Sequence, residues 1–294
     1  MTELFDLNEE MPKGFVELIS ANGRDAFRTG RSVALGIADE GEPAGAIVAF
    51  PTDDGTATIE SLYINPVYRR KGYASELLIE AINALYNYDN ILSIDADIVV
   101  NGREEPGTFE FFEAFDFDLE EDPVHGALSF ILEDAAKSEK VKGEIDKRVI
   151  PFGEALRTSR NKILSEHTML QRLVAANALD EEVSCIIERD DEDKLPSSCL
   201  ILGVEYNELI VAWAEAAEGT LDLVNMLRFA VVEALKKYGP KQKIRVPYIN
   251  EHSKSIILKL MGDKAEPSET VWNAHLELEY EFDGTLDDEL LEEG

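Results

Sequence analysis

The spacing of apolar residues changes repeatedly along the chain, and these changes predict strands that alternate with helices. Short apolar runs bounded by turn formers are typical of strands, and apolar positions three or four residues apart are typical of helices. In the first half, strands are predicted at residues 3–7, 32–39, 45–50, 56–64, 91–100 and 127–132, and helices at residues 14–27, 76–86 and 109–115. This order predicts an α+β domain with a mixed sheet.

A similar order of elements returns in the second half. Between residues 134 and 147 the sequence is charged and loses its apolar period, which is typical of a linker. Beyond it, helices are predicted at residues 154–176 and 221–238, and strands at residues 183–188, 199–204, 209–215 and 243–249. The chain therefore looks like two domains of one kind.

Two local matches support a duplication. Residues 83–88 (NALYNY) resemble residues 233–238 (EALKKY), and downstream residues 250–262 resemble residues 101–116 in the same order. The first match has an offset of 233 − 83 = 150 residues, which is the length of a domain and far longer than a solenoid repeat. We therefore predict a first domain at residues 1–134, a linker at 135–148, a second domain at 149–280 and an acidic tail at 281–294.

Composition and charge limit the classes of partner. The chain has 294 residues, 45% of them apolar, which is enough for two cores. It carries 60 acidic and 28 basic residues, a net charge of -32, and this charge repels nucleic acid and anionic membrane surfaces. Without a secretory leader or a long apolar span, we expect a cytoplasmic protein that binds neither nucleic acid nor membrane.

Cysteine and histidine give no distinct chemical signal. Cys185 and Cys199 fall on neighbouring predicted strands, where buried, reduced thiols are the common outcome. The four histidines are scattered without ligand spacing, so no metal site is predicted.

The most informative stretch is a short basic loop between a strand and a helix. Arg69, Arg70 and Lys71 are the only basic residues between Arg31 and Arg103. Gly72 and Ala74 follow, and small residues leave the first amides of the next helix open to an anion. A solvated basic turn is the simpler alternative, but the strand before and the amphipathic helix after favour a phosphate site.

This loop resembles the acetyl-CoA pyrophosphate motif of Gcn5-related N-acetyltransferases (the GNAT family), in which Gln or Arg is followed after two residues by Gly and, one residue later, by Gly or Ala. Here the motif is Arg69-x-x-Gly72-x-Ala74. The segment Phe111–Phe117 is similar to a later part of the same family. The resemblance implies two tandem acyl-CoA N-acyltransferase (GNAT)-like domains and acetyl-CoA as co-substrate.

The resemblance also implies roles for individual residues. The backbone of Leu62, Tyr63 and Ile64 would pair with the pantetheine arm, and Asn101 would contact the same region. The pyrophosphate would be held by Arg69, Arg70, Lys71, Gly72, Tyr73, Ala74 and Ser75.

Catalytic groups are only partly visible. Glu60 lies on the strand beside the expected thioester and is a candidate general base, as a glutamate on this strand is in several GNAT members; a solvent-facing carboxylate is the other reading. Phe112 stands where the family usually has a tyrosine as general acid, and phenylalanine has no proton to donate. Tyr63, Tyr68 and Tyr73 are possible substitutes.

In the second half, the matching loop near residues 219–224 contains Asp222 and no basic residue. A carboxylate there repels pyrophosphate, so we expect this copy to have lost the cofactor. The first hypothesis is an N-acetyltransferase that acts on an amine of unknown identity. The alternatives are a non-catalytic acyl-CoA-binding or interaction protein and, less favoured, a site for another phosphate ligand.

Overall fold

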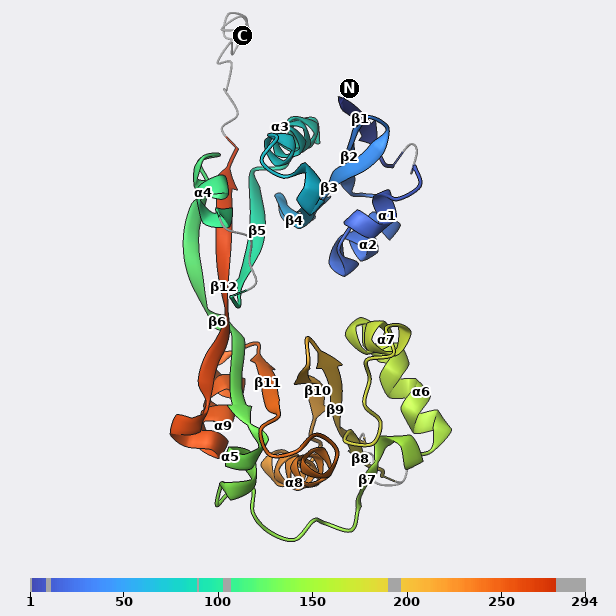
Figure 1. The fold of residues 1–294 in the computed structure, drawn as a ribbon, viewed down its shortest axis with the longest axis vertical. Helices are drawn as coiled ribbons and strands as arrows, with labels where there is room; N and C mark the ends of the chain where they lie inside the picture. Colours follow the sequence, from blue (N-terminus) through green and yellow to red (C-terminus); the bar gives the residue numbers. More distant parts are fainter. Residues whose placement is uncertain (1, 9–11, 89, 103–106, 190–196, 279–294) are drawn as a thin grey trace, which may run out of the picture. The chain divides into compact units, whose positions relative to one another are not determined.

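The computed structural model describes residues 2–8, 12–88, 90–102, 107–189 and 197–278 (Figure 1). These residues form two compact units that are interleaved along the chain. The first unit contains the described residues up to Ile98, those from Gly107 to Glu121, and those from Trp272 onward. The second contains Val99–Gly102 and the described residues between Asp122 and Val271.

The first unit is built on a mixed sheet. Its elements are β1 (Thr2–Asp6), α1 (Phe15–Leu18), α2 (Ala21–Arg28), β2 (Val33–Asp39), β3 (Glu42–Pro51), β4 (Thr56–Ile64), the 3₁₀ helix η1 (Pro66–Tyr68), α3 (Tyr73–Tyr86), β5 (Ser93–Val100), α4 (Thr108–Glu113) and parts of β6 (Asp118–Ile131) and β12 (Glu266–Glu277). The strand order is β1-β2-β3-β4-β5-β12-β6. β1 to β4 are antiparallel neighbours, and β4 and β5 run parallel.

Helices cover both faces of this sheet. Phe15 of α1 and the following Ile19 are buried against Ala46 and Val48 of β3. Gly45, one residue earlier in β3, faces α3, because an added Cβ would lie 3.4 Å from Leu77 Cδ1. Since neighbouring strand residues point to opposite faces, α1 with α2 and α3 lie on opposite sides of the sheet.

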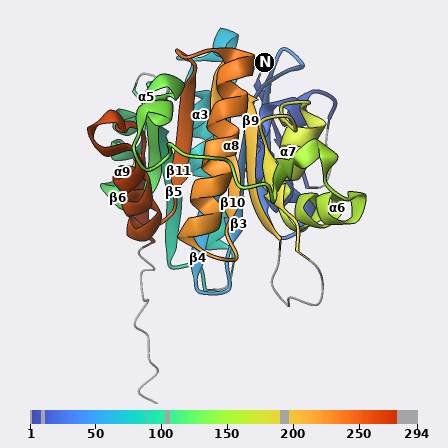
Figure 2. The ribbon, with the colours of Figure 1, turned by 90° about the horizontal axis from the view of Figure 1, so that it is seen from below.

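The second unit repeats this arrangement. Its elements are α5 (Leu132–Lys137), β7 (Val149–Pro151), η2 (Phe152–Glu154), α6 (Arg157–Glu166), α7 (Thr168–Ala175), β8 (Cys185–Ile187), β9 (Ser198–Glu205), β10 (Glu208–Glu215), α8 (Thr220–Tyr238), β11 (Lys243–Tyr248), α9 (Glu251–Met261), η4 (Gly262–Lys264) and the remaining parts of β6 and β12. The strand order is β12-β6-β11-β10-β9-β8-β7, with β10 and β11 parallel (Figure 2).

Each unit has a bulge at the same place in its sheet. On β4 the register passes from Ser61 to Ile59 while β3 advances by one residue, so Glu60 is the extra residue. On β10 the register passes from Val211 to Trp213, so Ala212 is the extra residue. The mixed sheets, the shared order of elements and the shared bulge confirm the predicted mixed fold in two tandem copies.

Several predicted boundaries differ from the structure. The helix expected at residues 14–27 is divided by Ser20, whose side chain accepts a hydrogen bond from Gly23 N–H and caps α2. β12 was not predicted, and only the end of β6 was, because charged and polar residues interrupt both strands. The division at residues 134 and 149 stays a prediction; in the structure Asp122–Ile131 belongs to the second unit. The predicted tail at 281–294 lies outside the described residues.

Candidate functional site

The basic loop joins η1 to α3 and is shaped by two residues with left-handed backbone. The side chain of Asn65 accepts a hydrogen bond from Val67 N–H and starts η1. Arg70 has φ 61° and Gly72, the N-cap of α3, has φ 87°. Only glycine adopts such a φ without strain, which explains why the motif has glycine at position 72.

Backbone amides at the start of α3 are suited to bind an anion. The first backbone hydrogen bond of α3 runs from Glu76 N–H to the Gly72 carbonyl at 3.0 Å. Within the described residues, no side chain caps this helix. The earlier amides of Tyr73, Ala74 and Ser75 therefore have no acceptor inside the helix. A Cβ at Gly72 would meet nothing within 4 Å, so a ligand can approach the backbone closely.

The cation of Lys71 is paired within the first unit. Its Nζ lies 2.8 Å from Asp39 Oδ2, and the Tyr73 hydroxyl donates to the same oxygen at 2.8 Å. Hydrogen bonds from Lys71 and Tyr73 hold the pKa of Asp39 below its ordinary value, and the bond to Asp39 raises the pKa of Tyr73. The end of β2 thus anchors the loop, through an aspartate that the sequence did not single out.

The two arginines of the loop are also held. Arg69 donates from Nε to the Ile64 carbonyl at 2.9 Å, and its guanidinium lies 5.7 Å from the centroid of the Tyr63 ring. Arg70 points toward the start of α4, because an added Cβ at Gly107 would lie 3.5 Å from Arg70 Nη1. These contacts hold one guanidinium at the end of β4 and direct the other toward the start of α4.

The end of β4 has one paired edge and one edge that β5 does not cover. Leu62, Tyr63 and Ile64 pair with β3 opposite Ile47, Ala46 and Gly45. The parallel pairing with β5 is confined to Thr56–Thr58 opposite Ser93–Asp95. The two parallel strands therefore separate before Leu62, which leaves backbone groups of β4 available to an extended ligand arm.

Glu60 is fixed by its position in the bulge. Its carbonyl accepts a hydrogen bond from the Ser20 hydroxyl at 2.9 Å, and Ser20 N–H donates to Ser61 Oγ at 2.9 Å. Gly23 of α2 packs so closely that an added Cβ would lie 2.7 Å from Ser61 Cβ. Bulges occur beside active sites, where they redirect a side chain.

The Glu60 carboxyl has an altered affinity for protons. Partial burial raises its pKa, and the nearby negative charge of Asp97 on β5 raises it further. A carboxylate with a raised pKa is a stronger general base. Asp97 was not predicted, although Asp95 and Asp97 alternate within an apolar strand, a pattern that marks one polar face.

The structure also shows where the predicted aromatic residues and Asn101 lie. Phe112 is buried, with its ring centroid 5.4 Å from that of Phe111 and 5.2 Å from that of Phe117. Tyr73 is buried and bonded to Asp39, whereas Tyr63 is 40% exposed at the end of β4. Asn101 follows β5 in a segment that groups with the second unit, so its contact with the cofactor stays a prediction.

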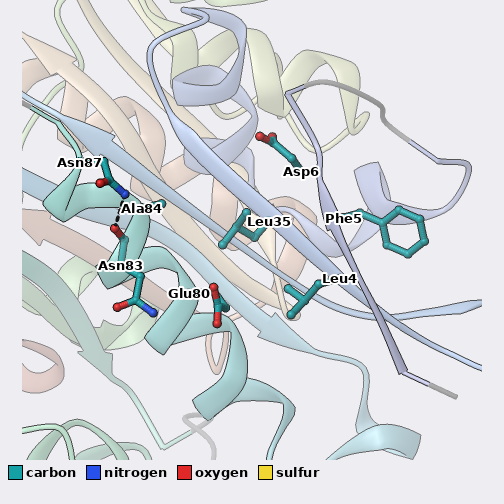
Figure 3. A pocket seen from close by; sticks show the side chains of 8 residues that line it. All are labelled: Leu4, Phe5, Asp6, Leu35, Glu80, Asn83, Ala84 and Asn87. Carbon is teal, nitrogen blue, oxygen red and sulfur yellow. Dashed lines mark hydrogen bonds between the residues drawn. The ribbon is translucent and has the colours of Figure 1, made fainter.

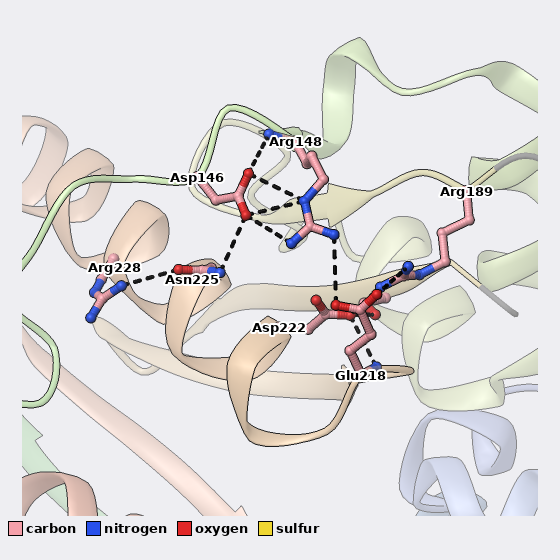
Figure 4. A network of polar contacts seen from close by, with 8 residues as sticks. Asp146, Arg148, Arg189, Glu218, Asp222, Asn225 and Arg228 are labelled. Atoms are coloured by element: carbon pink, nitrogen blue, oxygen red, sulfur yellow. Dashed lines mark hydrogen bonds and ion pairs between the residues drawn. The ribbon is translucent and has the colours of Figure 1, made fainter.

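The loop of the second unit contains a buried ion pair at the start of α8 (Figure 4). The fully buried Asp222 accepts hydrogen bonds from Arg189 Nη2 at 2.7 Å, from the Ser198 hydroxyl, and from Glu218 N–H at 3.2 Å. Although burial acts in the opposite direction, the bonds from Ser198 and Arg189 lower the pKa of Asp222. A fixed negative charge thus occupies the start of α8.

A separate cavity of about 310 Å³ lies between β1 and α3 (Figure 3). Leu4, Leu35 and Ala84 give it apolar walls, and Asp6 and Glu80 give it acidic ones. It contains none of the predicted site residues. The site is therefore defined by the loop and the separated strands, and this cavity is not part of it.

The cysteines are buried and chemically quiet, as predicted. Cys185 pairs with Leu200 and Cys199 with Ile186, so the two thiols point to opposite faces of the sheet. Burial raises the pKa of Cys199 to about 12 and that of Cys185 further still. In the described residues, no group of three or more His, Cys, Asp or Glu side chains is arranged to hold a metal ion.

Comparisons with known proteins agree with this geometry. Residues 2–103 match the sequence model of the Acetyltransferase (GNAT) family. No curated protein matches the chain.

Among the helices that the structure describes, none has the length and apolarity to span a membrane.

Solved structures extend the likeness over most of the chain. A tandem GNAT protein from the clavulanic acid biosynthesis pathway has a TM-score of 0.52 and 13% identity, covering 84% of this chain and 82% of its own. A GCN5-related N-acetyltransferase from Kribbella flavida has a TM-score of 0.48, 13% identity, and coverage of 93% and 70%. An acetyl-CoA-bound GNAT acetyltransferase from Elizabethkingia anophelis has a TM-score of 0.34, 15% identity, and coverage of 42% and 81%. Residues 2–103 thus match the Acetyltransferase (GNAT) family model, and the chain has the fold of a tandem GNAT protein.

Proposed function

We propose that the first unit is an N-acetyltransferase that transfers the acetyl group of acetyl-CoA to an amine. The observation that carries this proposal is the conjunction of open amides at the start of α3 with the uncovered edge of β4. A diphosphate fits the first, and an extended amide-containing arm fits the second. Membership of the GNAT family makes an acyl-CoA the expected co-substrate.

In this proposal the diphosphate of acetyl-CoA binds the amides of Gly72–Ser75, with Arg69, Arg70 and Lys71 around it. The helix N-terminus adds roughly 0.3–1 kcal/mol for an exposed anion and about 2 kcal/mol for a partly buried one. Leu62–Ile64 pair with the pantetheine arm, which brings the thioester toward the bulge. The acetyl carbonyl then lies within reach of an amine near Glu60.

Glu60 acts as the general base. An amine is mostly protonated at neutral pH, and only its neutral form attacks the thioester carbonyl. Glu60 takes that proton, the C–N bond forms, the C–S bond breaks, and the thiolate of CoA leaves and is protonated. The raised pKa of Glu60 brings its proton affinity closer to neutral pH, where such a transfer is most efficient.

A second candidate function is acyl-CoA binding without catalysis. The observation that favours it is Phe112, which is buried among aromatic rings at the position that the family resemblance assigns to the general acid. Without a proton donor, departure of the thiolate depends on solvent or on another group such as Tyr63. Acetylation of any amine in a broad panel excludes this second function.

The second unit contributes structure and does not bind CoA. Its loop already contains the carboxylates of Asp222 and Glu218, both paired with Arg189. A diphosphate would meet the buried negative charge of Asp222 there. This difference provides an internal control for the proposal.

Calorimetric titration with CoA tests the proposal on three proteins: the wild type, Gly72→Glu and Gly219→Glu. Both glycines are N-caps with positive φ, and Gly219 (φ 64°, ψ −135°) lies in a region less accessible to other residues than the left-handed region of Gly72 (φ 87°, ψ −1°), so Gly219→Glu controls for backbone strain. We expect Gly72→Glu to lose CoA binding through charge repulsion and blocked approach, and Gly219→Glu to bind as the wild type does. Equal loss in both variants, or no binding by the wild type, contradicts the proposal.

A further inference from the structure

A histidine from the end of the chain lies on the sheet of the first unit. His275 of β12 is hydrogen-bonded through Nδ1 to Asp95 Oδ1 of β5 at 2.6 Å. The two side chains are 46% and 42% exposed, so both are accessible to a ligand. The neighbouring Ala274 is fully buried, which places His275 on the opposite, open face of its strand.

Strand registers show which face of the sheet this is. Val48 of β3 packs with the residues of α1, so Phe50, two residues later, points to the same side. Phe50 pairs with Thr58 of β4, and Thr58 pairs with Asp95 of β5. Asp95 and its partner His275 therefore lie on the face that carries α1 and α2.

Glu60 belongs to the same polar row. Asp97 follows Asp95 by two residues on β5 and so points to the same face. The negative charge of Asp97 raises the pKa of Glu60, so the two carboxyls lie within electrostatic range of each other. The row contains Glu60 on β4, Asp97 and Asp95 on β5, and His275 on β12. Adjacent strands are about 4.8 Å apart where β4 and β5 pair, at Thr58 and Asp95.

From this row, and resting on the proposed function, we infer that His275 is a specificity-determining residue for the amine acceptor. Asp95 accepts the Nδ1 proton and so fixes the tautomer, which leaves Nε2 of the neutral ring as a hydrogen-bond acceptor. A primary ammonium group has three donors, and it can bind Nε2 together with the carboxylates of the row. A fixed positive charge at position 275 would repel the same ammonium.

The charged groups around His275 set the background for this effect. β5 contributes Asp95 and Asp97, and β4 contributes Glu60. On the other side, the part of β6 in the first unit contains Asp118, Glu120 and Glu121, and Glu277 lies two residues away on β12. All of these groups are acidic, so a cation placed at position 275 would change the charge of an otherwise negative group.

Steady-state kinetics with 1,4-diaminobutane as the acceptor tests the inference. We expect His275→Gln to change the acceptor KM less than His275→Lys does, because glutamine stays neutral. In both variants kcat at saturation changes less than the acceptor KM. His275→Lys raises the acceptor KM about fivefold or more at every pH, because it places a fixed cation in the row.

The chain contains a matched control. His125 forms the same kind of pair with Asp122, from Nδ1 to Oδ2 at 2.6 Å, and it is 49% exposed in the second unit. His125→Lys alters an equivalent pair and leaves the acceptor KM unchanged. If His125→Lys and His275→Lys have equal effects, the inference is wrong.

A binding experiment decides the question without turnover. The probe is CoA whose sulfur is joined through an acetyl linker to one amine of 1,4-diaminobutane, leaving the distal ammonium free. We expect His275→Lys to weaken this probe at least fivefold while CoA itself binds as in the wild type. Equal affinities for the probe in both proteins overturn the role of His275 and leave the proposed function standing. Failure of the wild type to bind CoA overturns both.

Discussion

Lys71 Nζ lies 2.8 Å from Asp39 Oδ2, and this ion pair has a charge-reversed counterpart in the second unit. Lys71 precedes the N-cap glycine of α3, as Glu218 precedes that of α8. Glu218 Oε1 lies 2.9 Å from Arg189 Nη1. In both units an ion pair therefore joins the loop to the neighbouring strand. The loop residue is the cation, Lys71, in the first unit and the anion, Glu218, in the second.

Strand registers confirm that these pairs are equivalent. Ile37 pairs with Gly45 and Ile187 pairs with Ser198, and Gly45 and Ser198 lie at the same distance from their bulges. Two residues beyond Ile37 and Ile187 are Asp39 and Arg189. Duplicated sheets have thus kept an anchor between strand and loop, in which the loop contributes the cation in the first unit and the anion in the second.

Exchange of the two charges in the first unit separates anchoring from cofactor binding. The double variant Asp39→Arg with Lys71→Glu reproduces the arrangement of the second unit. We expect its thermal unfolding to be closer to wild type than that of either single variant, because the ion pair is restored. We expect its CoA affinity to fall about tenfold or more, because a carboxylate replaces a cation beside the diphosphate. Wild-type CoA affinity in the double variant would show that Lys71 has no part in binding.

Replacement of Glu60 tests the proposed base. Glu60→Gln keeps the shape of the side chain and the backbone bulge but cannot accept a proton. We expect kcat to fall by about 10² to 10⁴, with CoA affinity unchanged in calorimetry. Asp53→Asn, on an exposed turn of the same unit, serves as the control for loss of one negative charge. A Glu60→Gln variant with wild-type kcat would exclude Glu60 as the base.

The loop could be predicted from sequence because its functional parts are contiguous. Arg69, Gly72 and Ala74 lie within six residues, between a strand and a helix that their own periods reveal. The partners of the site could not be found in this way. Asp39 and His275 reach it through strand pairing across 32 and 180 residues, and the sequence contains no local signal of those registers.

The same reasoning explains the missed strands. β12 and the beginning of β6 contain polar and charged residues, and their half-buried faces give no clean alternation. Because β12 was not predicted, nothing in the sequence linked His275 to Asp95. Asp97 could have been noticed, since Asp95 and Asp97 interrupt an apolar strand at the period of one face.

The pH dependence of the reaction provides a test of the pair formed by Glu60 and Asp97. The negative charge of Asp97 raises the pKa of Glu60, so removal of that charge lowers it. A base is active once it has lost its proton, so the rise of kcat/KM with pH should begin at lower pH in Asp97→Asn than in the wild type. Rate measurements across the acid range check this direction. A displacement toward higher pH, or none, would contradict the pairing.

The buried ion pair of Asp222 and Arg189 should matter for the stability of the protein and little for CoA binding. Arg189 is 7% exposed and Asp222 is fully buried, so Asp222→Ala leaves a guanidinium in the interior without its main partner. We expect the free energy of unfolding to fall by about 3 kcal/mol, since the loss of one partner of a buried pair is strongly destabilising. CoA affinity, measured below the unfolding temperature, should stay at the wild-type value.

The sign of the pH effect follows from the lowered pKa of Asp222. A carboxyl with a lower pKa in the folded state stabilises the protein above its unfolded pKa, about 3.9, and loses this effect as the pH falls through the folded pKa. The difference in unfolding free energy between wild type and Asp222→Asn should therefore be largest near neutral pH and shrink below about pH 4. Denaturant titrations at several pH values measure it. A difference that grows in acid, or a tenfold change in CoA affinity in Asp222→Ala, would show that this loop does more than hold the second unit together.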